Sequence, residues 1–127
     1  MKKVAGILLF GLVSLGLQAQ TVFGPMKDAV KAGSAKDLVR FLNSSIDINL
    51  EGDVNTYNKA QAEFVLRDFF KKHAPTDFTI KHTGASKGGL QFAIGEYQSG
   101  TDYYDVLMRV REVNKESLIH EISFVKK

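Results

Sequence analysis

The feature that most constrains the fold is a change of hydrophobic period at Pro75. Before it, the stretch NKAQAEFVLRDFFKKHAP (58–75) repeats apolar residues at helical spacing, so that one side carries Ala62, Val65, Leu66, Phe69, Phe70 and His73. Asn58 and Gln61 have the spacing of a capping box, and Pro75 disfavours helical geometry at the residue before it. After Pro75, apolar and polar residues alternate, which is typical of strands. The sequence therefore predicts one amphipathic helix, 58–74, followed by a sheet.

Four strands are predicted after Pro75, at 77–84, 90–97, 103–113 and 117–127. Short connections such as SKGG (86–89) join them, so we expect an antiparallel meander. The alternation assigns to the core face Phe78, Ile80 and His82; Leu90, Phe92 and Ile94; Tyr104, Val106, Met108 and Val110; and Leu118, His120, Ile122 and Phe124. A sheet with one apolar face must bury that face, and the helices are the material available for it.

The segment before residue 58 predicts two short helices, at 21–33 and 34–42, or one helix bent at Gly33. A short strand at 46–50 and a turn at 51–55 lead into the helix 58–74. The predicted fold class is therefore α+β, with a curved antiparallel meander sheet packed against three N-terminal helices. Phe64 points away from the apolar side of its helix, and we expect it to pack against the first helices; an interface role is the alternative.

The first 19 residues have the plan of a secretory signal peptide. Lys2 and Lys3 precede a glycine-broken apolar run, and cleavage is expected near Ala19. The run is short for a membrane span, which needs about 20 residues, although an uncleaved anchor is the alternative. We therefore expect a single domain at 20–127 that is exported, either periplasmic or released, and that has no membrane anchor after cleavage.

Composition excludes several kinds of partner and site. The chain has no cysteine, which excludes disulfides, thiolate metal sites and cysteine nucleophiles. Removal of Lys2 and Lys3 lowers the formal net charge of +3 by two, and no basic block remains to neutralise a row of phosphates. We therefore expect no nucleic-acid partner. We also expect no cofactor and no metal, because the sequence contains no paired-histidine motif.

Three stretches carry a resemblance to a known family: YNKAQAEFVLRDFF (57–70), HTGASKGG (82–89) and FAIGEY (92–97). Together with the leader, they resemble a family of small exported bacterial proteins of unknown function with the nuclear-transport-factor-two-like fold, a cystatin-like cone. The resemblance implies a cone with a natural cavity and brings no catalytic residues. Enzymes of the wider fold, such as ketosteroid isomerases and polyketide cyclases, carry an acid–base residue inside the cone, and that motif is not found here.

The candidate pocket residues follow from strand parity. His82, Glu96 and His120 are the polar residues that parity assigns to the apolar face, where they could transfer protons or hold a metal. The alternative is that His120 is a hydrogen-bonded core residue. A bulge at Gly95 would turn Glu96 outward and bring Tyr97 in. The lining of the cone, or simply its core, is expected to include Phe92, Tyr104 and Met108.

The opposite face of strand 103–113 is the candidate interface. It carries Asp105, Leu107, Arg109 and Arg111. Mixed apolar and charged residues suit a sheet-to-sheet homodimer, which the fold often forms. A solvated face with cross-strand ion pairs is an equal alternative.

The predicted function is a non-catalytic exported binding or interaction domain. Its partner would be a small, mostly apolar molecule held in the cone, or another exported protein. An acid–base enzyme of the isomerase or dehydratase type, with His82, Glu96 or His120 as general base, is one alternative. A structural dimer module is the other.

Overall fold

The computed structural model describes residues 22–127. The predicted signal peptide, 1–19, lies outside these residues. Within the part of the chain that is described, no helix is long and apolar enough to cross a membrane.

Three α-helices lie in the described chain: α2 (Gly24–Lys31), α3 (Ala35–Leu38) and α4 (Lys59–Lys72). The predicted capping box forms between Asn58 and Gln61, and the Ser34 hydroxyl caps α3 by accepting a hydrogen bond from the Asp37 amide. The second helix is shorter than predicted. It continues as a 3-10 turn, Val39–Phe41, and the chain is already a strand at Leu42.

Six strands form one sheet: β1 (Leu42–Leu50), β2 (Asp53–Asn58), β3 (Asp77–Ser86), β4 (Leu90–Ser99), β5 (Asp102–Val113) and β6 (Glu116–Lys126). Their order is β2-β1-β6-β5-β4-β3, and the last four strands form the predicted antiparallel meander. The prediction of a simple turn at 51–55 is wrong. Glu51 and Gly52 alone make the turn, both at positive φ, and β2 returns along β1.

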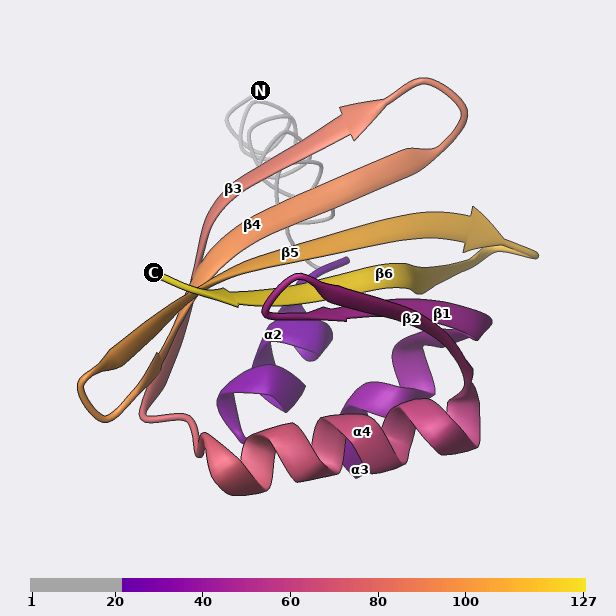
Figure 1. Ribbon diagram of the computed structural model, residues 1–127. Coiled ribbons are helices and arrows are strands. Elements are labelled where there is room, and N and C mark those ends of the chain that lie inside the picture. The colour runs from indigo at the N-terminus through magenta and orange to yellow at the C-terminus, as the bar shows by residue number, and fades with distance from the viewer. Residues whose placement is uncertain (1–21) are drawn as a thin grey trace, which may run out of the picture.

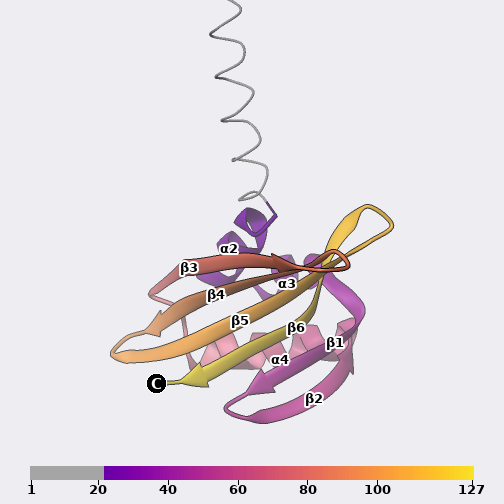
Figure 2. The same cartoon turned by 90° about the horizontal axis from the view of Figure 1, so that it is seen from above.

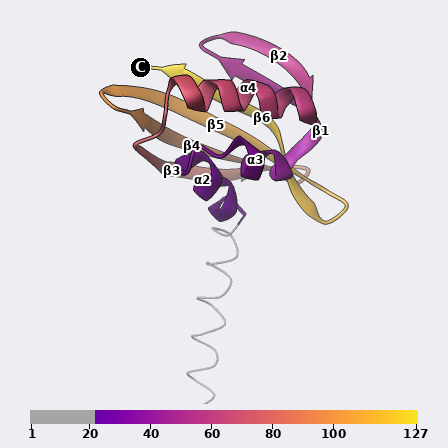
Figure 3. The ribbon, with the colours of Figure 1, turned by 90° about the horizontal axis from the view of Figure 1, so that it is seen from below.

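The parallel pairing of β1 with β6 joins the β1–β2 hairpin to the meander. Figure 1 shows the curved sheet with the helices beneath it, and the view from above in Figure 2 shows the strands lying side by side. Seen from below, all three labelled helices lie over one face of the sheet (Figure 3). We call that face the inner face and the opposite one the outer face. The predicted α+β class with a curved sheet on three helices is confirmed.

Aromatic side chains fill the space between α4 and the inner face. Phe69 lies at its centre, with its ring centroid 4.5 Å from Phe124, 5.6 Å from Tyr104 and 5.7 Å from Tyr97. The Tyr97 hydroxyl donates to the backbone carbonyl of His73, at the end of α4. Burial raises the pKa of the Tyr97 hydroxyl, so it remains a donor. Phe64, in contrast, is 70% exposed, and the expectation that it packs against the first helices is wrong.

Two register shifts decide which side chains reach the core. In β3 the pairing with β4 passes from Ile80 to His82, which leaves Lys81 as an extra residue. In β6 the pairing with β5 passes from Ile119 to Glu121, which leaves His120 as the extra residue. Each extra residue reverses the inward and outward alternation beyond it.

Candidate functional site

Tyr104 and Met108 lie on the inner face, as parity predicts. They are 2% and 0% exposed, so both side chains are buried. The Tyr104 hydroxyl lies 3.1 Å from Nδ1 of His73, and Tyr104 also contacts Phe69 edge to face. Burial, followed by the charge of Asp102, raises the pKa of Tyr104. Both side chains therefore belong to the core, and their burial among residues 22–127 does not support the predicted role in ligand binding.

His82, Phe92 and Glu96 lie on the outer face, and the parity that placed them in the core is wrong. In β4 the buried positions are Ala93, Gly95 and Tyr97, which alternate with the three residues predicted to be inside, Leu90, Phe92 and Ile94. The alternative prediction, in which Tyr97 points inward and Glu96 outward, matches the structure. It is not produced by a bulge at Gly95, because the pairing of β4 with β5 has no register shift at that residue. The shift lies in β3, where the extra residue Lys81 turns His82 outward.

His120 is the extra residue of the β6 bulge, half-buried, with Nδ1 3.1 Å from the carbonyl oxygen of Leu118. Across the sheet His82 is level with Ile94, Leu107 and Ser123, and His120 lies three residues from Ser123 along β6. The three strand spacings between β3 and β6 alone amount to roughly 14 Å at ~4.8 Å each. The predicted pocket of His82, Glu96 and His120 is therefore not assembled. Among residues 22–127, no group of three histidine, aspartate or glutamate side chains is arranged to hold a metal ion.

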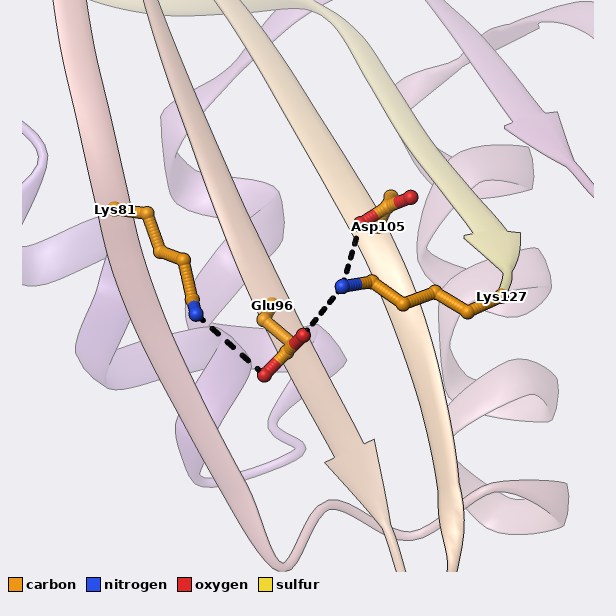
Figure 4. A network of polar contacts seen from close by, with 4 residues as sticks. All are labelled: Lys81, Glu96, Asp105 and Lys127. Carbon is orange, nitrogen blue, oxygen red and sulfur yellow. Dashed lines mark hydrogen bonds and ion pairs between the residues drawn. The ribbon is translucent and has the colours of Figure 1, made fainter.

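Glu96 is held on the outer face by two lysines (Figure 4). Lys127 Nζ lies 2.6 Å from Oε2 of Glu96, and Lys81 Nζ lies 3.8 Å from Oε1. Lys127 also reaches Asp105 at 3.5 Å. The hydrogen bond from Lys127 lowers the pKa of Glu96, and the same hydrogen bond raises the pKa of Lys127. A carboxylate held ionised in this way is suited to holding strands together and poorly suited to general base catalysis.

Replacing Glu96 by glutamine should make the protein less sensitive to acid. Because the folded-state pKa of Glu96 is lowered, its contribution to stability is present above the unfolded-state pKa and is lost as pH falls through the folded-state value. We expect Glu96→Gln to lower the melting temperature at about pH 7 and to leave it close to wild type at about pH 3. Circular dichroism melts measure both. Glu112→Gln, an exposed carboxylate of the same sheet, is the control, and equal pH profiles for the two variants would contradict the assignment.

An apolar groove of about 420 Å³ crosses the outer face over β3, β4 and β5. This outer groove is lined by Ser86, Leu90, Phe92, Ile94, Leu107 and Arg109. Gly84 makes room for the Phe92 ring, because a Cβ at residue 84 would lie 2.4 Å from that ring. The ring therefore lies against the backbone of β3. Ile94 is 40% exposed, which is unusual for an isoleucine in the middle of a strand.

The four candidate interface residues lie on the outer face as predicted. Asp105, Arg109 and Arg111 are exposed, and Leu107 is half-buried beside Ile94, its partner on β4. Nε of Arg109 lies 3.2 Å from Oε1 of Glu121 on β6. The outer face thus carries both the mixed surface predicted from β5 and an apolar strip on β4 that parity had assigned to the core.

Sequence reasoning missed Leu90 and Ile94 as surface residues. One sequence signal could have placed them there. In β4 the small residues Ala93 and Gly95 alternate with the large ones. Gly95 lies under Phe78, whose ring would be 2.9 Å from a Cβ at that position. Small residues on a core face indicate that neighbouring aromatic rings already fill the space.

Comparison with solved structures shows the same architecture in other proteins. A DUF4783 family protein from Bacteroides uniformis ATCC 8492 has a TM-score of 0.78 at 24% identity, covering 82% of this chain and 95% of that one. A protein named for the NTF2 fold has a TM-score of 0.67 at 17% identity, covering 84% and 96%. A domain of unknown function with a cystatin-like fold from Nostoc punctiforme PCC 73102 has a TM-score of 0.67 at 13% identity, covering 88% and 76%.

The fold predicted from the resemblance, nuclear-transport-factor-two-like and cystatin-like, is thereby confirmed. A comparison with curated proteins finds no match. A family model described as "Domain of unknown function (DUF4783)" matches residues 23–124, which is most of the chain. The protein therefore belongs to the DUF4783 family, whose function is unknown.

Proposed function

We propose that the protein is an exported, non-catalytic interaction domain that binds its partner through the outer face of the sheet. The observation that carries the proposal is the outer groove, where Phe92, Ile94 and Leu107 form an apolar strip on the face that the helices leave uncovered. Apolar strips with a charged surround mark interaction sites on soluble proteins. Here Arg109 and Glu121 lie on one side of the strip, and Glu96, Lys81 and Lys127 lie on the other.

The charge pattern supports binding over acid–base chemistry. A general base must share a site with the group it deprotonates, and His82, Glu96 and His120 do not converge. A small, mostly apolar ligand is the second candidate occupant, because the volume of the outer groove lies within the range of small-molecule sites. We place it in this groove and not in the cone, where Tyr104 and Met108 are already packed. The proposal that the protein is exported depends on the signal peptide predicted at 1–19.

Native mass spectrometry of the protein purified from its own host tests the proposal. We expect an associated species, which is a second copy, another protein or a small molecule. Ile94→Asp should remove it, because a carboxylate in the centre of the apolar strip must be desolvated when the face is covered.

Val54→Asp is the matched control. Val54 is 55% exposed and lies on the edge strand β2, away from the outer groove, so this variant should keep the associated species. Circular dichroism should show that both variants are folded. A wild-type protein that is always free, or an associated species that survives Ile94→Asp, would contradict the proposal.

A further inference from the structure

The outer groove combines an apolar floor on β4 with a single cation on β5. The pairing of these strands puts Phe92 opposite Arg109 and Ile94 opposite Leu107. The only other polar side chain in the lining is that of Ser86, and within residues 22–127 no carboxylate lines the groove. The charge of a bound molecule would therefore be met by Arg109.

Arg109 keeps hydrogen-bond donors for a bound molecule although it forms an ion pair. Its Nε lies 3.2 Å from Oε1 of Glu121, which is on β6, the side of β5 away from the groove. A guanidinium has five N–H donors, and a single carboxylate accepts from at most two of them in a bidentate pair. The Arg109 side chain is also 51% exposed. A second anion can therefore reach it from the groove.

The charges around this end of the groove leave an excess of positive charge. Arg111 projects from the outer face like Arg109, and none of the ion pairs within residues 22–127 involves it. Two cations and the one carboxylate of Glu121 leave one positive charge uncompensated. Beyond the other end of the groove, two carboxylates are already neutralised by two lysines: Glu96 and Asp105 by Lys81 and Lys127.

We propose that the outer groove binds an anionic amphiphile, a fatty acid whose carboxylate is held by Arg109 and whose aliphatic chain lies on Phe92 and Ile94. A carboxylate matches the guanidinium in charge and in planar geometry. The chain removes apolar surface from water, including that of Ile94, which is 40% exposed. Both contacts fall within one groove of about 420 Å³, the size of a small-molecule site. This inference rests on the proposed function and names the chemistry of its small-molecule occupant.

Octanoate and 1-octanol test the two halves of the ligand separately, because they share a chain and differ in the charge of the head. Chemical-shift titration of the protein's amides by NMR measures both affinities. Arg109→Gln should weaken octanoate binding by about tenfold or more and leave 1-octanol within about twofold of wild type. Ile94→Asp should weaken both, because it puts a carboxylate under the chain. In the wild-type protein, octanoate should shift the amides of 90–94 and 107–109.

Arg67→Gln is the matched control. Arg67 lies on α4, its side chain is 60% exposed, and it pairs with Glu63 much as Arg109 pairs with Glu121. This variant loses the same charge away from the groove and should bind octanoate as the wild type does. Circular dichroism should show every variant folded. Shifts confined to α4 or to the inner face would overturn the placement of the ligand.

The remaining outcomes separate this inference from the proposed function. An Arg109→Gln protein that binds octanoate as tightly as wild type, or that loses octanoate and 1-octanol equally, would overturn the role of the carboxylate. A wild-type protein that does not bind octanoate, but carries another protein that is lost in Ile94→Asp, would overturn the fatty acid and keep the proposed function. A wild-type protein that binds no octanoate and has no associated species would overturn both.

Discussion

Replacing Phe69 by alanine is expected to lower the free energy of unfolding by about 3–5 kcal/mol. Phe69 is 6% exposed and is the main link between α4 and the sheet, with Phe124, Tyr97 and Tyr104 around its ring. Alanine would leave a cavity that these rings cannot close, because each is held by other contacts. Tyr97, for example, is fixed by its hydrogen bond to the carbonyl of His73.

Urea unfolding followed by circular dichroism measures this change, and the same helix supplies its control. Phe64 is 70% exposed, so Phe64→Ala removes the same atoms from α4 and should cost about 0.5 kcal/mol or less. Losses of similar size for the two variants would show that Phe69 does not hold the helix on the sheet. The comparison cancels the difference in helix propensity between phenylalanine and alanine, because both substitutions are made inside α4.

Replacing Gly95 by alanine is expected to destabilise the protein by about 1–3 kcal/mol, although it adds one methyl group. A Cβ at this position would lie 2.7 Å from the carbonyl oxygen of Thr79 and 2.9 Å from the Phe78 ring. The oxygen belongs to the neighbouring strand and cannot move without disturbing the pairing of β3 with β4. The added volume must therefore displace Phe78, which is 1% exposed and has no free space to enter.

Gly24→Ala is the matched control for this substitution. Gly24 begins α2 and has no heavy atom within 4 Å of an added Cβ. Alanine there should leave stability unchanged or raise it by up to about 1 kcal/mol, because alanine favours helix more than glycine does. Urea unfolding of the two variants should give opposite or clearly unequal shifts. A Gly95→Ala protein as stable as wild type would mean that β3 and β4 can separate at this point without cost.

The helices could be predicted from sequence because their signals are local. α4 combines a capping box at Asn58, an apolar stripe of helical period and a proline after its last turn, all within one segment. β5 was equally clear, with Tyr104, Val106, Met108 and Val110 buried on alternate positions as predicted. In both elements the pattern depends only on residues of the element itself.

The missed features depend on neighbours that are distant in the sequence. β2 (DVNTYN) is short and mostly polar, and it is a strand because β1 offers it a partner. Lys81 and His120 are extra residues because β4 and β5 have no residue that pairs with them, and this pairing cannot be read from β3 or β6 alone. In β4 the large residues Leu90, Phe92 and Ile94 look like a core stripe, but the inward positions between Tyr97 and the hairpin are Ala93 and Gly95, and at Gly95 the Phe78 ring leaves no room for a larger side chain.

The same distinction explains which candidate site residues were predicted on the correct face of the sheet. The candidate interface residues Asp105, Leu107, Arg109 and Arg111 could be placed on the outer face because β5 has a regular alternation. The pocket residues His82, Phe92 and Glu96 were misplaced because one extra residue, or one choice of face, moves every side chain of a strand to the other side. The same error hid the apolar half of the outer groove.

The position of β6 has a consequence for the order in which the molecule can form. β6 follows the other five strands in the sequence, yet it lies in the interior of the sheet, with β1 on one side and β5 on the other. Until residues 116–126 have been made, the β1–β2 hairpin and the β3–β5 meander have no strand to join them. Contacts that close such long loops are made late and slowly. The sheet therefore stays open in the nascent chain until β6 has been synthesised.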